Sequence, residues 1–232
     1  MLAVALMLAT KSWFGRFLGL AGAGLGCVAM AMTYSRASWI GLVVAAAVFV
    51  LLWNRKLIPA GIVVAFVAAG MLPETVLHRI KTIGDMSDTS TSSRFPVYEA
   101  ALNFIRLHPI QGAGLGTDAV RSAVEDLRLF RGEDVFIHCH NIYLQVWFET
   151  GIAGLLTFVG GILWTCKQGA RAIVSCVSRT RLAVVGCVSA LAGSMVCGLA
   201  DYLWNYPRVM LIFWFVCALG LAATRLAGRE EG

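Results

Sequence analysis

The chain has 232 residues, of which 59% are hydrophobic and only 14% are charged, and its mean hydropathy is +0.76. Soluble domains are closer to half apolar and a quarter charged, so this composition excludes an ordinary soluble protein and indicates one that crosses a membrane repeatedly. The formal net charge is +6, but no basic face interleaved with aromatic residues accompanies it, which argues against a nucleic-acid partner. We therefore expect an all-α, polytopic membrane protein surrounded by membrane lipid.

Six apolar segments approach the length of about 20 residues that a membrane-spanning helix needs. These segments are 17–34, 37–53, 57–72, 142–165, 182–200 and 208–224. Residues 1–10 are also apolar, but they are too short to span and lack the basic start of a signal peptide. We expect them to be the end of a helix whose beginning is missing, so that the chain is a fragment or a shortened reading frame.

Clusters of Lys and Arg at alternate ends of these segments predict their orientation, because such residues concentrate in cytoplasmic loops. The clusters are Lys11/Arg16, Arg55/Lys56, Lys167/Arg171/Arg179/Arg181 and Arg225/Arg229. All of them can face the cytoplasm if every segment spans. The predicted parts are then N-terminal membrane helices (1–72), the first of them truncated, a periplasmic loop domain (73–140), C-terminal membrane helices (141–225) and a cytoplasmic tail (226–232).

The outer-face insert 73–140 concentrates the titratable groups of the chain. It contains all four histidines, seven of the nineteen basic residues and nine of the thirteen acidic residues. Long loops in compact proteins are more often functional than idle. We therefore expect the chemistry of the protein to lie in a helical insert on the outer face.

Within this insert, Arg94 precedes a helix that is predicted to open at Pro96 and to end at His108-Pro109. The spacing of its apolar residues predicts an apolar stripe, made of Phe95, Tyr98, Leu102 and Ile105, that can lie on the membrane or on a helix bundle. An arginine beside a helix N-terminus can fork onto a phosphate. The alternative is a surface arginine that only caps neighbouring groups.

The glycine run 111–117 is similar to a dinucleotide-binding loop, but it follows a helix and a proline instead of a strand. We interpret it as a hinge at which the backbone approaches a helix or a ligand closely. Thr117 or Asp118 is expected to cap the next helix. The expected apolar face of that helix and its end are Val120, Val124, Leu127, Phe130 and Gly132.

The insert closes with His138-Cys139-His140 and leads into a helix on which Asn141, Gln145 and Glu149 recur at every fourth position. Ionisable groups inside a membrane cost about 2.5–3.5 kcal/mol and usually face a cavity or a partner. This polar stripe indicates a functional site, or else a helix cap followed by a hydrogen bond between helices. A zinc site would need ligands from a second cluster, which the insert lacks, so we expect no metal.

Two outer turns complete the candidate surface. Arg36 lies in Ser35-Arg36-Ala37-Ser38-Trp39 between two predicted spans, on the face that topology rules keep poor in Lys and Arg. Arg36 and Arg94 are therefore predicted to approach the same outer surface as the histidines. The last outer turn, 201–208, carries aromatic residues typical of a membrane interface, and its Asp201–Arg208 pair is expected to be structural.

In combination these segments resemble the O-antigen ligase and polymerase superfamily of bacterial inner-membrane glycosyltransferases, which includes protein O-oligosaccharyltransferases. The resemblance covers roughly residues 20–165, and no single motif would suffice for it. The motifs, in order, are Ser35-Arg36-x-x-Trp39, Arg94 opening an outer helix, His108-Pro109-Ile110-x-Gly112-x-Gly114-x-Gly116-Thr117, and His140-Asn141-x-x-Leu144-Gln145-x-x-x-Glu149-x-Gly151-x-x-Gly154.

The resemblance implies an inverting transfer, without metal or cofactor, at the periplasmic face of the inner membrane. The implied donor is an undecaprenyl-pyrophosphate-linked glycan, and the implied acceptor is a hydroxyl such as one on lipid A–core. Arg36 and Arg94 would hold the pyrophosphate and neutralise it as it leaves. His140 would take the proton from the acceptor hydroxyl as general base. The residues expected to support this site are Asn141, Gln145 and Glu149.

The sequence leaves several alternatives open. A polymerase of repeat units or a protein O-oligosaccharyltransferase would look nearly the same as a ligase. A solute transporter would place charges or broken helices near the bilayer midplane, whereas here the charges gather at the outer boundary. A non-catalytic membrane remnant is favoured by the short length, since the chain resembles only the C-terminal half of family members.

Overall fold

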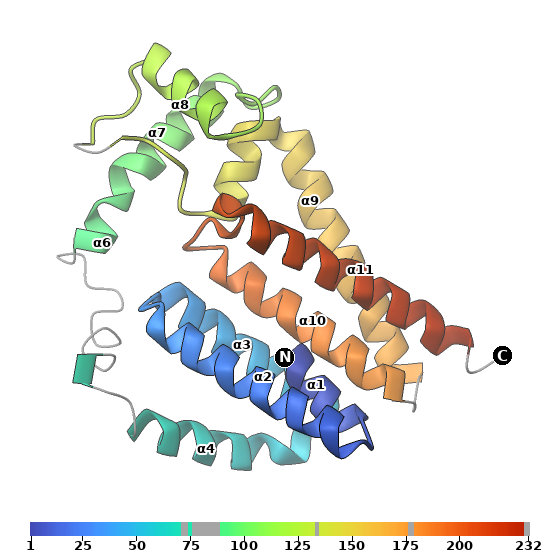
Figure 1. Ribbon diagram of the computed structural model, residues 1–232. Helices are drawn as coiled ribbons and strands as arrows, with labels where there is room; N and C mark the ends of the chain where they lie inside the picture. The colour runs from blue at the N-terminus through green and yellow to red at the C-terminus, as the bar shows by residue number, and fades with distance from the viewer. Residues whose placement is uncertain (71–73, 76–88, 133–134, 176–178, 230–232) are drawn as a thin grey trace. The chain divides into compact units, whose positions relative to one another are not determined.

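The computed structural model describes residues 1–70, 74–75, 89–132, 135–175 and 179–229 (Figure 1). This part of the chain is helical and contains no strand, which confirms the predicted all-α class. Its contacts divide it into two compact units, each assembled from separate stretches of chain. Unit 1 comprises Met1–Lys81, Ile162–Val196 and Leu211–Gly232, and unit 2 comprises Thr82–Gly161 and Cys197–Met210.

The helices of unit 1 are α1 (Leu2–Ala9), α2 (Trp13–Met32), α3 (Arg36–Trp53), η1 (Arg55–Leu57), α4 (Ile58–Gly70), α10 (Arg179–Cys197) and most of α11 (Pro207–Arg229). The helices of unit 2 are α6 (Thr89–Ser92), α7 (Arg94–Leu107), α8 (Thr117–Asp126) and η2 (Leu203–Asn205). The long helix α9 (Ile142–Ser175) begins in unit 2 and continues into unit 1 after Gly161.

Five helices of the described residues are long and apolar enough to cross a membrane, which confirms a polytopic membrane protein. They are Trp13–Met32, Arg36–Trp53, Ile142–Ser175, Thr180–Cys197 and Pro207–Ala227. The predicted span 57–72 contains α4, which has 13 residues and is shorter than the length of about 20 that a span needs. Residues 71–72 lie outside the described part, so a crossing at this point stays a prediction.

The predicted parts 1–72, 73–140, 141–225 and 226–232 are defined by their side of the membrane. Contacts between residues do not measure that side, so this division stays a prediction. Residues 76–88, within the predicted loop domain, and 230–232, within the predicted tail, lie outside the described residues. The two compact units differ from this predicted division in one respect. They place the start of α9 and the turn before α11 in the same unit as most of the insert.

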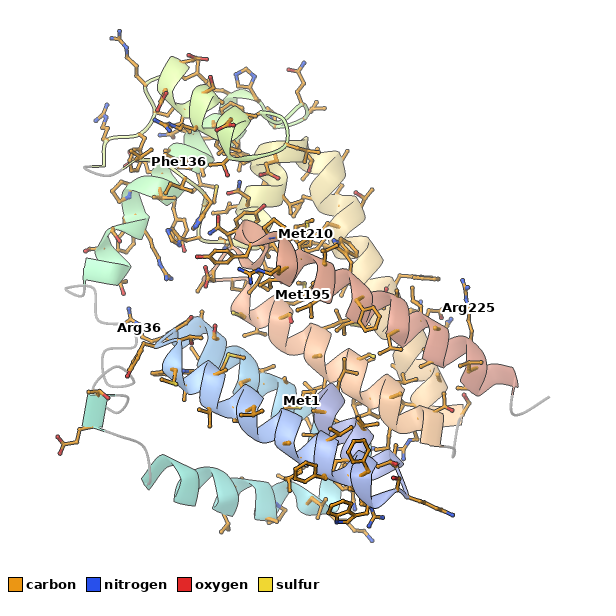
Figure 2. The ribbon with its side chains drawn as sticks, viewed as in Figure 1. Met1, Arg36, Phe136, Met195, Met210 and Arg225 are labelled. Atoms are coloured by element: carbon orange, nitrogen blue, oxygen red, sulfur yellow. The ribbon has the colours of Figure 1, made fainter. Side chains whose placement is uncertain are left out.

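Serine caps begin the first two long helices of unit 1. The Ser12 hydroxyl accepts a hydrogen bond from the Gly15 N–H at 3.4 Å, and the Ser35 hydroxyl accepts one from the Ser38 N–H at 3.3 Å. The Trp39 indole N–H donates to the Met30 carbonyl at 3.0 Å across the turn that joins α2 to α3. Arg36, labelled in Figure 2, is therefore the first residue of α3 in unit 1.

Unit 1 has an apolar core, and an arginine bonds backbone carbonyls at the ends of two of its helices. The buried residues of this core are Ala5, Phe49, Ile173, Val184, Val185 and Ala223. The Arg181 guanidinium donates to the Leu52 carbonyl at 3.0 Å and to the Ile173 carbonyl at 3.1 Å. These two carbonyls lie near the ends of α3 and α9, where the helix itself supplies no donor, so Arg181 satisfies both helix ends.

The core of unit 2 forms where α7, α8 and the start of α9 meet. Its buried residues are Val97, Ala100, Ala101, Phe104, Val120, Val124, Phe136, Cys139 and Phe148. Phe104 of α7 stacks on Phe148 of α9 with ring centroids 4.1 Å apart. Phe136, labelled in Figure 2, lies in the segment between α8 and α9, and its ring is tilted against that of Phe148 with centroids 6.1 Å apart. This core holds the start of α9 against α7.

The apolar stripe predicted for α7 is buried at Ile105 and half-buried at Tyr98, and its other two members are exposed, so its contact with the membrane or a helix bundle stays a prediction. Phe95 is 50% exposed and Leu102 is 39% exposed, whereas Ala100 and Ala101 are fully buried. Apolar residues occupy more than one face of this helix, so periodicity does not single out one of them. The small alanines allow close packing, and that packing decides which face is buried. The predicted end of the helix at His108 is confirmed.

The predicted cap and end of α8 are wrong, although the burial of Val120 and Val124 is confirmed. The N-cap residue is Gly116, with φ +97°, and no side chain caps this helix. The helix ends at Asp126, and Arg128, with φ +51°, takes the left-handed conformation that the sequence pattern assigns to Gly132. Core packing of the two valines therefore outweighs the local capping signals.

Candidate functional site

Four segments of unit 2 converge on the residues that the sequence singles out: the N-terminus of α7, the loop 135–141, the first turns of α9 and the turn 198–206 (Figure 1). Asn141 begins α9, because its side-chain oxygen accepts from the N–H groups of Tyr143 at 2.9 Å and Leu144 at 3.0 Å. Its amide N–H donates to the Leu199 carbonyl at 2.8 Å. Asn141 thus orients the helix that follows the histidines.

Gln145 connects the histidine loop to Glu149. Its side chain is buried, with 1% exposure. The Gln145 oxygen accepts from the Cys139 backbone N–H at 2.7 Å, and its amide nitrogen donates to the Glu149 carboxylate at 2.9 Å. The Gly116 backbone N–H also donates to that carboxylate. The polar stripe is therefore a chain of satisfied hydrogen bonds that ties the loop, α9 and the glycine run together.

Helix α9 breaks at Gly151, which has φ +68° and ψ −175°. Backbone groups in and beside the glycine run form hydrogen bonds at this break, and these replace the hydrogen bonds that a continuous helix would make. The replacement bonds are Ile152 N–H to the Pro109 carbonyl at 2.9 Å, Ala113 N–H to the Phe148 carbonyl at 2.7 Å and Gly114 N–H to the Glu149 carbonyl at 3.0 Å. The part of α9 that follows the break is still longer than the length of about 20 residues that a membrane-spanning helix needs.

Two glycines make this close approach possible. A Cβ on Gly112 (φ +70°) would lie 2.5 Å from the Glu149 carbonyl oxygen, and a Cβ on Gly151 would collide with the Ile110 carbonyl oxygen. The interpretation of the run as a hinge that approaches a helix is confirmed at Gly112. The break at Gly151 is not predicted from the sequence, because the apolar pattern continues across it.

We expect Gly151→Ala to lower the free energy of unfolding by about 1–3 kcal/mol, because alanine tolerates neither this backbone conformation nor the carbonyl of Ile110. Gly160→Ala is the matched control in the same helix, since a Cβ there meets nothing within 4 Å. Denaturation of the purified protein in detergent measures both variants. Equal stability of the two would show that the break needs no glycine.

The two histidines of the closing loop lie against each other. Their ring centroids are 4.2 Å apart, and the His140 backbone N–H donates to Nδ1 of His138 at 3.3 Å. His140 has φ +45°, a conformation that residues other than glycine adopt only when their surroundings hold them in it. His138 also contacts the ring of Tyr202 at 5.6 Å. Both imidazoles are half-buried and held by neighbours.

Arg94 lies beside this pair as the first residue of α7. Its Nη1 donates to the Ala200 carbonyl at 2.8 Å. Tyr98, one turn further along α7, donates its hydroxyl to the His140 carbonyl at 3.3 Å and is hydrogen-bonded to the Arg94 guanidinium. A guanidinium has five N–H donors, so Arg94 can bind an anion while it keeps its bond to Ala200. Tyr98 therefore links the anion-binding candidate to the candidate base.

The surroundings of the histidines favour their neutral forms. Burial, together with the charges of His138 and Arg94, lowers the pKa of His140 to about 4, although the charge of Asp201 acts in the opposite direction. Burial also lowers the pKa of His138. Burial raises the pKa of Tyr202 to about 12, so its phenol stays protonated. At neutral pH the site therefore offers a neutral imidazole that can accept a proton beside a fixed positive charge.

The structure brings together five of the six predicted site residues: Arg94, His140, Asn141, Gln145 and Glu149. Arg36 belongs to unit 1, so its part in the site stays a prediction. Sequence reasoning missed the contacts of Tyr98, which it placed in an apolar stripe although this residue lies four positions after Arg94. It placed residues 201–208 on the outer face but missed the contacts of the preceding residues 198–200, which carry no motif.

The helices and the site define an integral membrane protein that gathers an arginine, two histidines and a hydrogen-bonded carboxylate in one compact unit. The chain belongs to the O-antigen ligase family, since residues 2–159, more than half of its length, match that family. The resemblance carried by the motifs is thereby confirmed. A comparison with curated proteins found no match.

Membership of this family gives the chain a function of the O-antigen ligase or polymerase type. The family acts in general on a lipid-linked glycan donor and a glycan acceptor. All six predicted site residues lie inside the matched region, whereas the turn 198–206 lies beyond it.

Proposed function

We propose that the protein transfers a glycan from an undecaprenyl-pyrophosphate donor to an acceptor hydroxyl, such as one on lipid A–core, at the periplasmic face of a bacterial inner membrane. The observation that supports this proposal most directly is that Arg94 lies close enough to His140 for its charge to act on the imidazole, while Tyr98 bonds both the Arg94 guanidinium and the His140 backbone carbonyl. Arg94 suits a pyrophosphate and His140 suits the proton of a hydroxyl, and the reaction needs both.

In the proposed step, the acceptor oxygen attacks the anomeric carbon of the donor sugar while the bond from that carbon to the pyrophosphate breaks. His140 takes the hydroxyl proton, and the pyrophosphate leaves with the bonding electron pair. Attack opposite to the leaving group inverts the anomeric configuration. Arg94 and Arg36 neutralise the charge that develops on the leaving group, so this step uses neither a metal nor a cofactor.

Donor binding would also strengthen the base. In the free site, the positive charge of Arg94 contributes to the low pKa of His140. A bound pyrophosphate brings negative charge to Arg94 and offsets this contribution, which raises the pKa of His140. The base would then become a better proton acceptor only when a donor is in place.

The function is tested with the purified protein in liposomes, a defined undecaprenyl-pyrophosphate-linked oligosaccharide and lipid A–core as acceptor. We expect a glycosylated lipid A–core and release of undecaprenyl pyrophosphate. Extension of the donor in the absence of lipid A–core would instead identify a polymerase, and glycosylation of a peptide would identify a protein O-oligosaccharyltransferase. A folded protein that binds donor but modifies none of these acceptors would overturn the proposal and favour a non-catalytic remnant.

The periplasmic placement predicts different accessibility at two exposed serines, Ser122 of α8 and Ser175 at the end of α9. Each is changed to cysteine in a variant whose native cysteines are replaced, and intact spheroplasts are treated with a membrane-impermeant thiol reagent. We expect Ser122→Cys to react at once and Ser175→Cys to react only after permeabilisation. The reverse pattern would place the site on the cytoplasmic face.

A further inference from the structure

Backbone carbonyls of the turn that follows α10 accept hydrogen bonds from residues of the candidate site. This turn lies beyond the region that matches the family. Three consecutive carbonyls of this turn each accept one hydrogen bond of 2.8 Å. The donors are the Ile142 N–H to Gly198, the Asn141 side-chain amide to Leu199, and Nη1 of Arg94 to Ala200. The first two donors belong to the start of α9, and the third belongs to α7.

These bonds set where Arg94 lies relative to the histidine loop. Because consecutive carbonyls are joined by rigid peptide units, the start of α9 and the Arg94 guanidinium are fixed to the same short piece of backbone. The Tyr98 hydroxyl closes the arrangement by bonding the His140 carbonyl. The turn therefore fixes the positions of Arg94 and of the start of α9, which follows directly on His140.

The next two residues of the turn lie beside the histidine pair. The Tyr202 ring contacts His138 at 5.6 Å between ring centroids. The Asp201 carboxylate accepts the Tyr202 backbone N–H at 2.9 Å, which restricts where its charge can lie. That charge raises the pKa of both His138 and His140. The expected structural pairing with Arg208 does not account for this influence on the histidines.

In the described part of the chain, the other groups that act on the histidines oppose the charge of Asp201 or are neutral. Arg94 from α7 lowers the pKa of both imidazoles, and His138 itself lowers that of His140. Tyr98 from α7 and Tyr202 from the turn are phenols whose pKa is raised by burial, so they remain uncharged at neutral pH. Among the residues that the structure describes, Asp201 is therefore the negative charge that acts on both rings, and Arg94 is the positive charge that acts on both.

We propose that the turn Gly198–Tyr202 is part of the active site, in which its carbonyls position Arg94 and the start of α9, and Asp201 is a positioning residue that supplies the counter-charge to the histidine pair. When His140 takes the acceptor proton it becomes an imidazolium on which the positive charge of Arg94 acts, and the two positive charges repel each other. The Asp201 carboxylate offsets this repulsion. The catalytic part of this inference rests on the proposed function, whereas the charge coupling does not.

The coupling is tested by titrating the imidazoles of the full chain in lipid nanodiscs by NMR, with signals assigned through His138→Gln and His140→Gln. Asp201→Asn removes the charge but keeps an oxygen that can accept the Tyr202 N–H. We expect it to lower the pKa of both histidines by about 0.5–1, whereas Asp201→Glu keeps values near those of the wild type. Asp126→Asn, at the exposed end of α8, is the control and should change neither.

The same variants are compared in the transfer assay across pH. Asp201→Asn should move the acidic limb of the rate profile to lower pH and reduce the rate at its plateau by several-fold, up to about tenfold. A merely structural residue would lower the rate without moving the limb. Asp201→Ser is a second neutral variant should the asparagine variant fold poorly.

Unchanged histidine pKa values in the neutral Asp201 variants would overturn the inference. Shifted pKa values in a protein whose wild type transfers no glycan would instead overturn the proposed function and leave the charge coupling standing. A shifted pKa with an unmoved acidic limb would separate Asp201 from the reaction and overturn its positioning role.

Discussion

His140→Ala is expected to lower the rate of glycan transfer by about 10²–10⁴-fold, which is the usual cost of removing a general base. Donor binding should change little, because the anion-binding candidate Arg94 keeps its bond to the Ala200 carbonyl. Single-turnover transfer with saturating donor and acceptor measures the chemical step alone. Near-normal chemistry in this variant would remove the assignment of His140 as base.

His138→Ala is the matched comparison and should lose much less activity. His138 accepts the backbone N–H of His140 and lies against its ring, so its removal loosens the base without deleting it. Glu149→Gln should be intermediate, because Glu149 acts on the site through Gln145. Equal losses in the two histidine variants would reopen the possibility of a metal bound by both.

The pH dependence of transfer supplies an independent check on the base. The pKa of His140 is lowered to about 4 in the free site, so kcat/KM should stay constant from neutral pH downward and fall only near pH 4, where the imidazole becomes protonated. Bound pyrophosphate raises this pKa, so kcat should begin to fall at a higher pH than kcat/KM does. An acidic limb at the same pH in both profiles would contradict the activation of the base by the donor.

Arg94→Lys is expected to reduce transfer by about 10²–10³-fold, nearly as much as Arg94→Ala. The guanidinium donates to the Ala200 carbonyl, bonds Tyr98 and still has N–H groups for the pyrophosphate. An ammonium group keeps the charge but cannot make all of these contacts in one plane. The steady-state rate with a defined lipid-linked donor measures the loss, and donor affinity should fall with it.

Arg106→Lys is the control in the same helix. Arg106 is exposed, and within the described residues its hydrogen bond goes to the side chain of Asn103, three positions earlier. This control should retain the wild-type rate. Arg36→Lys should behave like Arg94→Lys if Arg36 holds the same pyrophosphate. Should Arg36→Lys and Arg94→Lys both express normally and transfer at wild-type rates, the two arginines are structural and the pyrophosphate site lies elsewhere.

Local chemistry was enough to predict several elements of this protein. Apolar runs long enough to span a bilayer require helices, because a backbone in lipid must satisfy its own hydrogen bonds. The end of α7 at His108 follows from the His-Pro pair, whereas its start lies at Arg94, two positions before the Pro96 at which the sequence predicts it. The motif residues Arg94, His140 and Gln145 were identified in the same way, from residue type and order.

The buried face of α7, the break in α9 and the turn at the site were decided only by tertiary structure. Because α7 has apolar side chains on several faces, its sequence does not determine which face is buried. That face is determined by packing against Phe148 and Val120. The break at Gly151 exists because groups of the glycine run replace the lost helix hydrogen bonds. Arg94 and Ala200 are 106 positions apart in the chain. A hydrogen bond over that separation leaves no periodicity or local motif in the sequence, because it depends on how the intervening helices pack.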